Sequence, residues 1–280
     1  MTAAQPIADA RPSPIAGQWY PGDAAVLAQT IDDMLDSAQV PASPGRIVGF
    51  LVPHAGIRYS GHVAAHAFKL ARGIDASHVV VISPMHHVYA APVLTSAHAA
   101  YRTPLGDIPV DHDSLKAIDE RVPLQAVQRD PEHSLEIELP FLQRTLGEFR
   151  LVPLMLHEQS LTLAKQLGET LADVLKPLGR SLIVASSDLS HFYTHDVAQG
   201  YDAAMLEQVE AFDPAGVLRV EEQGRGFACG RGAIATMLVA ARALGADTAR
   251  VVKHATSGEI SGDYNRVVGY GAAVVYRATT

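Results

Sequence analysis

The sequence alternates short apolar runs with longer segments in which apolar residues recur every three or four positions. The short runs, such as RIVGFLV at 46–52, are rich in β-branched side chains and are typical of strands buried on both faces of a sheet. The longer segments are typical of helices with one buried face. This alternation predicts an α/β fold, a single domain whose mainly parallel central sheet is flanked by helices and has an antiparallel edge. The predicted strands are 46–52, 78–82, 150–156, 181–185, 250–255 and 267–276.

Capping residues set most of the predicted helix boundaries. Asp23 and Ser60 are expected to cap helices that end near residues 37 and 72, and Asp196 is expected to cap one that ends near residue 210. The other predicted helices are a short one after Asp111, 160–176, a short one from Asp213-Pro214, and 231–244, with a β-hairpin expected within 91–110.

A further helix is expected over 130–146. Pro140 lies inside it and predicts a kink unless it occupies a solvent-facing or irregular turn, because proline lacks the amide that an inner helical turn requires. Glu132 and Glu136 near its start fit two interpretations equally well. They are either partners of the positive helix N-terminus or members of a functional site.

Polar side chains follow three of the predicted strands at the point where each strand ends. Pro53 and Pro84 cannot donate a ladder hydrogen bond, so they end their strands, and His54 and His86 follow them. The strand 181–185 runs into Ser186-Ser187-Asp188-Leu189-Ser190-His191. Ligands bind at the carboxyl ends of the strands in open α/β sheets. His54, His86, Asp188, His191 and Cys229, which precedes the helix 231–244, are therefore expected to converge on one pocket.

Two imidazoles together with a carboxylate or a thiolate form a donor set that suits Fe(II), Zn or Cu. Cys229 lies beside Arg231 at a predicted helix N-terminus, which favours its thiolate, although a buried inert cysteine fits the sequence equally well. His62 and His66 are spaced like zinc ligands on one helix face. No glutamate accompanies them as in H-E-x-x-H, so a structural role is predicted for both.

Composition and charge exclude several classes of protein. The net charge of −8 and the pI near 5.9, without a basic stripe, argue against nucleic acid as a partner. No apolar run approaches the ~20 residues of a membrane span. A single cysteine excludes an internal disulfide and fits the reducing cytoplasm. Residues 1–15 lack the apolar core of a signal peptide and are expected to be a flexible lead-in to a domain over 16–280. The aromatic pair Trp19-Tyr20 before Pro21 indicates a lid or a packing plug across the body of this domain, and a core position is favoured over a site position for Trp19.

Several short motifs, each weak alone, occur in a specific order along almost the whole chain. They are Ala16-Gly17-x-Trp19-Tyr20, Pro53-His54-Ala55-Gly56, Tyr59-Ser60-Gly61, Pro84-x-His86-His87, Thr103-Pro104-Leu105, Glu132-His133-Ser134-x-Glu136, Pro140-Phe141, Ser186-Ser187-Asp188-x-x-His191 and Cys229-Gly230. With this ordered set, the chain resembles the Memo family, whose prokaryotic members are called AmmeMemoRadiSam system protein B.

The resemblance implies a fold similar to that of class III extradiol dioxygenases, which use one non-haem iron. It also implies that His54, His86 and Cys229 are metal ligands, with Asp188 and His191 beside them. Extradiol enzymes have a glutamate where this chain has Cys229, and this difference favours a softer metal or a redox role. The family name refers to genes for a radical SAM protein and an AMMECR-domain protein, which the resemblance implies as partners.

The expected cofactor is therefore one transition-metal ion, with Fe(II) favoured and Cu or Zn as alternatives. The leading hypothesis is a cytoplasmic, dioxygenase-like oxidoreductase that acts on a small molecule such as a phenol. In it, His191 is a general acid/base, Asp188 is a further catalytic residue, and His133 orients the substrate or a ligand. Two other hypotheses stay open. One is a non-catalytic scaffold that binds a metal or, as described for Memo relatives, peptides, and that works with the radical SAM and AMMECR-domain partners. The other is a hydrolase that activates water on the metal.

Overall fold

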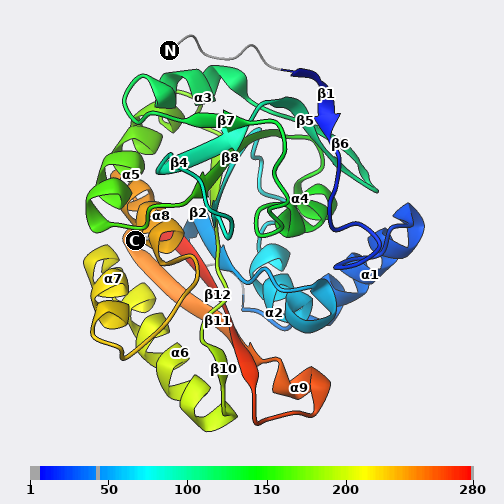
Figure 1. Ribbon diagram of the computed structural model, residues 1–280, viewed down its shortest axis with the longest axis vertical. Coiled ribbons are helices and arrows are strands. Elements are labelled where there is room, and N and C mark those ends of the chain that lie inside the picture. Colours follow the sequence, from blue (N-terminus) through cyan, green and yellow to red (C-terminus); the bar gives the residue numbers. More distant parts are fainter. Residues whose placement is uncertain (1–6, 42–44, 279–280) are drawn as a thin grey trace.

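A computed structural model of the protein describes residues 7–41 and 45–278, and a nine-stranded sheet runs through its centre (Figure 1). Four parallel strands form the middle of this sheet, in the order β2 (Gly45–Val52), β9 (Ser181–Ser186), β3 (His78–Pro84) and β8 (Arg150–Leu156). Antiparallel neighbours continue it on both sides, because β12 pairs with β2 and β4 pairs with β8. The predicted α/β fold with a parallel centre is confirmed, and the sheet as a whole is mixed. The outer strands are β10 (His191–Tyr193), β11 (Thr248–Thr256), β12 (Val267–Ala278), β4 (Val93–Ser96) and β7 (Gln125–Val127).

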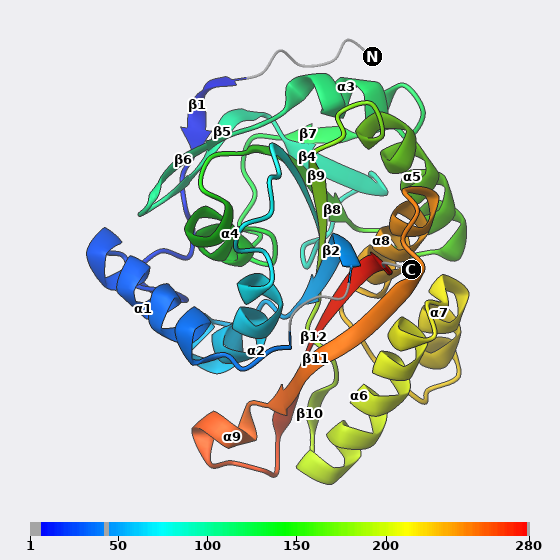
Figure 2. The ribbon, with the colours of Figure 1, turned by 180° about the vertical axis from the view of Figure 1, so that it is seen from behind.

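Helices cover both faces of this sheet, which explains why its central strands are continuous apolar runs. The helices α5 (Leu161–Leu175) and α8 (Arg231–Ala243) lie on one face (Figure 1). The helices α2 (Ile57–Lys69) and α4 (Leu139–Leu146) lie on the other, with α1 (Ala24–Ser37) packed against them (Figure 2). Among the described helices, none is long and apolar enough to span a lipid bilayer. The remaining helices are α3 (His112–Asp119), η1 (Glu136–Glu138, a 3₁₀ helix), α6 (His195–Glu210), α7 (Pro214–Glu222) and α9 (Gly258–Ser261).

A second sheet of three strands consists of β1 (Ile7–Arg11), β5 (His98–Thr103) and β6 (Gly106–Pro109). The strands β5 and β6 form the hairpin predicted within 91–110, whereas β4 from the same segment joins the large sheet. The prediction of a flexible lead-in over 1–15 is wrong for residues 7–11, because they pair with β5 and the side chain of Arg11 is buried. Residues 1–6 of that lead-in lie outside the described residues.

Two helices begin earlier than the capping pattern predicts. The helix α2 starts at Ile57, and the Ser60 hydroxyl donates instead to the Ala55 carbonyl, 2.8 Å away, from inside the first turn. The helix α6 starts at His195, so Asp196 lies in its first turn rather than at its cap. A negative charge in the first turn still suits the helix dipole, which explains why the sequence pattern at Asp196 resembles a cap.

The segment 130–146 is helical only in its second half. Residues 130–135 form an irregular loop, and η1 and α4 follow it. Pro140 lies in the first turn of α4, where the helix needs no amide donor, so the predicted kink is absent. Because no helix begins at Glu132, its interpretation as a partner of a helix N-terminus is wrong.

The order of the central strands brings the predicted site residues together. The strand β9 lies between β2 and β3, so the carboxyl ends of these three parallel strands are neighbours. His54 and His86 each follow their strand by two residues. The polar stretch that starts at Ser186 leaves the sheet between them.

Candidate metal centre

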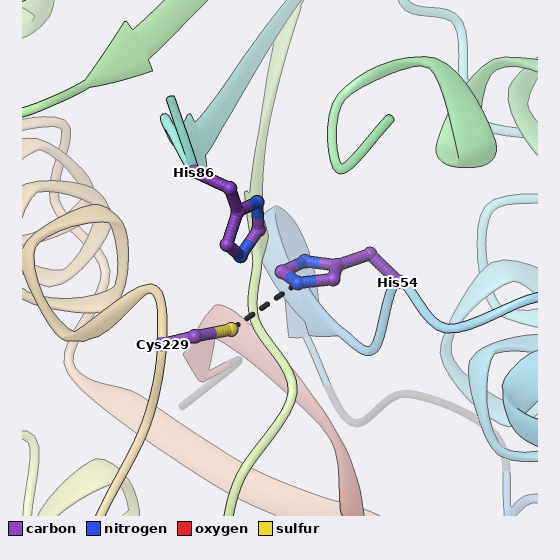
Figure 3. Close-up of side chains that lie close together, drawn as sticks. All are labelled: His54, His86 and Cys229. Atoms are coloured by element: carbon purple, nitrogen blue, oxygen red, sulfur yellow. Dashed lines mark hydrogen bonds between the residues drawn. The ribbon is translucent and has the colours of Figure 1, made fainter. Parts of the chain in front are cut away.

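Three side chains from distant parts of the chain point toward one another at the carboxyl edge of the sheet (Figure 3). His54 comes from the loop after β2, His86 from the end of β3, and Cys229 from the loop before α8. His54 Nε2 lies 3.2 Å from Cys229 Sγ. One donor atom from each residue lies within 4.8 Å of the other two, so the predicted convergence of these three residues is confirmed.

This donor set fits a transition-metal ion. Ligand atoms that lie ~2.0–2.3 Å from a tetrahedral ion are about 3.5 Å apart, which is close to the separation of His54 Nε2 and Cys229 Sγ. A thiolate and two imidazoles suit Fe(II), Cu or Zn better than Mg or Ca. His54 is buried, Cys229 is half-buried and His86 is exposed. Solvent therefore reaches the group from the side of His86.

The stretch that follows β9 holds His54 at both its backbone and its ring. Asp188 Oδ1 accepts hydrogen bonds from the amides of His54, at 2.8 Å, and Ala55, at 3.2 Å. The ring atom Nδ1 of His54 lies 2.9 Å from Ser186 Oγ. With Nδ1 engaged in this way, Nε2 is the nitrogen that His54 directs at Cys229.

Glu132 holds His86 and His133 from an enclosed position. Its carboxylate accepts from the amide of His86 at 2.6 Å and from the ring Nδ1 of His86 at 3.0 Å. It also accepts from the amides of His133 and Ser134, at 2.9 Å each, and His133 Nδ1 lies 3.3 Å away. His86, Glu132 and His133 are close enough to form a metal-binding group of their own. Because N–H donors occupy both of its oxygens, Glu132 is better suited to orienting the two rings than to binding a metal.

The environment keeps two of these imidazoles uncharged. Burial, and then repulsion from His133 and His86, lowers the pKa of His54 well below its usual value. Burial also lowers the pKa of His133 to about 4, against the attraction of Glu132. Burial opposes the charged form of His86 as well, but the hydrogen bond and the charge of Glu132 outweigh it and raise the pKa of His86. His54 and His133 therefore offer uncharged nitrogen atoms at neutral pH.

The prediction that Cys229 is a thiolate is wrong for the metal-free protein. Burial, and then the negative charge of Asp188, raises the pKa of the Cys229 thiol well above its usual value. Arg231 does not compensate, because its Nη1 pairs with Glu221 Oε1 at 2.5 Å. Metal binding to Cys229 therefore requires the thiol to lose its proton.

The three predicted catalytic residues lie around this group in different ways. The ring centroid of His133 is 4.9 Å from that of His86 and 5.5 Å from that of His54. Asp188 is buried against the backbone of His54, and burial raises its pKa to about 7. His191 is half-buried. Burial lowers its pKa, and repulsion from His86 acts in the same direction, whereas the hydrogen bond to the Leu189 carbonyl opposes the shift. Its Nδ1 donates to the Leu189 carbonyl at 2.7 Å, which leaves Nε2 as an acceptor.

Trp19 packs against the hydrophobic core, as predicted, and it also covers part of the site. Its ring centroid lies 4.1 Å from that of His133. The Trp19 carbonyl accepts from the amide of Ile57, which joins the N-terminal segment to the start of α2. The aromatic pair Trp19-Tyr20 before a proline indicates a lid or a packing plug, and the contact of Trp19 with His133 agrees with both descriptions.

His62 and His66 lie on α2 and belong to no metal-binding group among the described residues. His66 Nδ1 donates to the carbonyl of His62, one turn back, at 2.7 Å. This bond supports the structural role predicted for His66.

Comparisons with known proteins agree with the motifs in the sequence. The family model described as "Memo-like protein" matches residues 11–274. A MEMO1 family protein of Methanopyrus kandleri is 37% identical over 276 residues, which cover 94% of this chain and 97% of that protein. A MEMO1 family protein of Nitrosopumilus maritimus is 33% identical over 267 residues, which cover 92% and 96%. Among solved structures, the uncharacterized protein JW3007 of Escherichia coli K12 aligns with 82% of this chain and 100% of its own, but its TM-score of 0.42 and identity of 12% are too low to bear on function. The family match and these two relatives show that the chain belongs to the Memo family.

Proposed function

We propose that the protein is a cytoplasmic metal-dependent oxidoreductase that acts on a small molecule. One transition-metal ion would be held by His54, His86 and Cys229, with Fe(II) favoured and Cu or Zn as alternatives. The observation that carries this proposal is the convergence of the three side chains while Nδ1 of each histidine is engaged elsewhere. Partners on Nδ1 fix the ring orientation of metal-binding histidines, and here they leave Nε2 of both rings for the ion.

The ion would supply Lewis-acid and redox chemistry when bound. The residues around it supply orientation and proton transfer. The ring of His133 packs against the rings of Trp19 and His86. These contacts restrain its position, so His133 is suited to orienting a substrate. No hydrogen bond to His191 Nε2 is found within residues 7–41 and 45–278, and the lowered pKa keeps the ring uncharged, so His191 is the stronger candidate for the general acid/base.

Anaerobic titration of the metal-free protein with Fe(II) and Zn(II) tests the ligand set. We expect the wild type to bind about one ion, and we expect Cys229→Ser and His54→Gln to lose at least about tenfold in affinity, since each removes a direct ligand. His66→Gln removes a histidine outside the group and is the matched control. Undiminished affinity in Cys229→Ser would exclude the thiol as a ligand.

Oxygen consumption by the Fe(II)-loaded protein with phenolic compounds tests the reaction class. His191→Ala is expected to keep the metal and to lose roughly 10²–10⁴-fold in turnover, the usual contribution of a general acid/base. Tight metal binding without consumption of any tested substrate would instead favour a non-catalytic metal-binding protein.

A further inference from the structure

A second buried carboxyl group lies beside His54 and belongs to neither metal-binding group. Glu138, at the end of η1, is 1% exposed, and its Oε1 lies 2.8 Å from Ser186 Oγ. Ser186 Oγ is also the atom that contacts His54 Nδ1, at 2.9 Å. The same hydroxyl lies 2.6 Å from the carbonyl oxygen of Ser134. Ser186 Oγ therefore has three polar neighbours and one hydrogen atom to share among them.

The hydrogen atoms can be assigned because the Ser134 carbonyl can only accept. Its contact is the shortest of the three, so it takes the hydrogen of Ser186. The lone pairs of Ser186 Oγ then accept from His54 Nδ1–H and from a protonated Glu138. Burial, assisted by the charge of Asp188, raises the pKa of Glu138 well above its usual value, in agreement with the neutral acid.

We infer that Glu138 and Ser186 are positioning residues that hold His54 with its hydrogen on Nδ1 and the lone pair of Nε2 facing Cys229. The inference rests on the proposed function, because the choice of nitrogen matters for binding a metal. Without a donor at Glu138, only the Ser134 carbonyl holds the hydrogen of Ser186, and in part of the molecules the hydroxyl turns toward His54 Nδ1. It would then stabilise the opposite tautomer, in which Nε2 carries the hydrogen and cannot bind a metal.

The two proposed ligand histidines are thus held by acids of different charge. Glu132 orients His86, whose side chain is 34% exposed, as a carboxylate surrounded by N–H donors. His54 is enclosed, and a second ionised carboxylate beside it would cost more free energy than a neutral acid. The neutral acid acts through a serine, which accepts from the ring in place of the carboxylate.

Nuclear magnetic resonance of the metal-free protein containing ¹⁵N-labelled histidine tests the tautomer, because long-range ¹H–¹⁵N correlations distinguish Nδ1–H from Nε2–H. We expect the Nδ1–H form of His54 in the wild type and in Glu138→Gln, whose amide can still donate to Ser186. We expect a mixture of tautomers in Glu138→Leu and a larger change in Ser186→Ala. Ser83→Ala removes another fully buried serine hydroxyl, at the end of β3, and is expected to match the wild type. An unchanged His54 tautomer in both Glu138→Leu and Ser186→Ala would overturn the inference.

Infrared spectroscopy at neutral pH tests the protonation of Glu138. The carbonyl band of a protonated carboxylic acid is expected in the wild type and is expected to be lost in Glu138→Gln. If Glu138→Gln loses a carboxylate band instead of the carbonyl band of a protonated acid, the hydrogen assignment is overturned. If Glu138→Leu does not fold, the tautomer in Ser186→Ala and the infrared comparison still decide whether Glu138 and Ser186 position the ring of His54.

Fe(II) affinity in the same variants separates this inference from the proposed function. Ser186→Ala is expected to lose about 10–100-fold, Glu138→Leu less, and Glu138→Gln almost nothing. If the wild type binds no metal but the tautomer changes as expected, the proposed function fails and the positioning role stands. If the wild type binds metal and Glu138→Leu changes neither the tautomer nor the affinity, the role of Glu138 fails and the proposed function stands.

Discussion

At the scale of single residues, the nitrogen that an imidazole offers depends on what engages its other nitrogen. Glu132 engages His86 Nδ1 and at the same time accepts from three backbone amides. The hydrogen bonds from these amides hold the carboxylate in place, and the carboxylate orients the ring of His86. Loss of the charge at Glu132 should therefore disturb the metal-binding group without removing any of its donor atoms.

We predict that Glu132→Gln lowers Fe(II) or Zn(II) affinity by about 10–100-fold, the usual effect of changing a residue that orients a ligand. A glutamine has one acceptor oxygen, so it cannot serve all the donors that Glu132 serves. Anaerobic metal titration measures the effect, and Glu120→Gln, a change on the surface, is the control. Equal affinity in Glu132→Gln and wild type would show that His86 needs no such partner.

The sequence was informative about the donors and much less so about the groups that hold them. His54, His86 and Cys229 could be predicted because each lies next to a recognisable element end, and the topology of an α/β sheet brings such ends together. The partners of these residues follow no such rule. Glu138 and Ser186 are 48 positions apart, and their contact depends on where the folded chain places the end of η1 relative to the end of β9. No local sequence pattern indicates that these two residues come into contact.

At the scale of elements, burial on both faces made the central strands predictable. The strands β2, β3, β8 and β9 are continuous apolar runs, and their predicted ranges agree with the structure to within two residues. The strands β7 and β10 have three residues each and are partly exposed, so they carry no comparable pattern. β1 was missed because it pairs only at the edge of the small sheet.

The loop 130–135 shows why a sequence that favours a helix can adopt another structure. Arg11 Nη2 pairs with Asp130 Oδ1 at 2.6 Å, and Arg11 Nη1 pairs with Glu136 Oε2 at 2.5 Å. The hydroxyl of Tyr20 donates to Glu136 Oε1 at 2.6 Å. These buried bonds come from the N-terminal segment, far away in sequence, and they outweigh the local preference for a helix.

Arg11→Met is predicted to destabilise the protein by about 3–5 kcal/mol, because it leaves buried carboxylates without their partner. Urea unfolding followed by circular dichroism measures the change. Arg102→Met breaks a surface pair with Asp107 and should have little effect. Equal stability of Arg11→Met and wild type would mean that the ion pairs of Arg11 contribute little to the fold.

At the scale of the whole molecule, the candidate metal centre of His54, His86 and Cys229 joins three regions of the chain that meet only in the folded state. The loops after β2 and β3 supply the histidines, and the loop before α8 supplies the thiol. An unfolded chain does not hold these donors together. A bound ion should therefore favour the folded state over the unfolded one.

We predict that free metal at about 100 times its dissociation constant adds roughly 2.7 kcal/mol to the free energy of unfolding. For a domain of this size, that gain corresponds to a rise of about 5 °C in the melting temperature. Calorimetry under anaerobic conditions measures the shift, and Cys229→Ser should show little of it. The same shift in wild type and Cys229→Ser would place the stabilising ion elsewhere.

The positions of the three donors along the chain also decide when during protein synthesis the group can form. A ribosome starts at the N-terminus, so a nascent chain that has reached residue 228 contains both histidines but not the thiol. At that stage β2 also lacks its neighbour β12. The group of His54, His86 and Cys229 can therefore form only after residue 229 has been translated, and a chain that terminates earlier lacks one of its three donors.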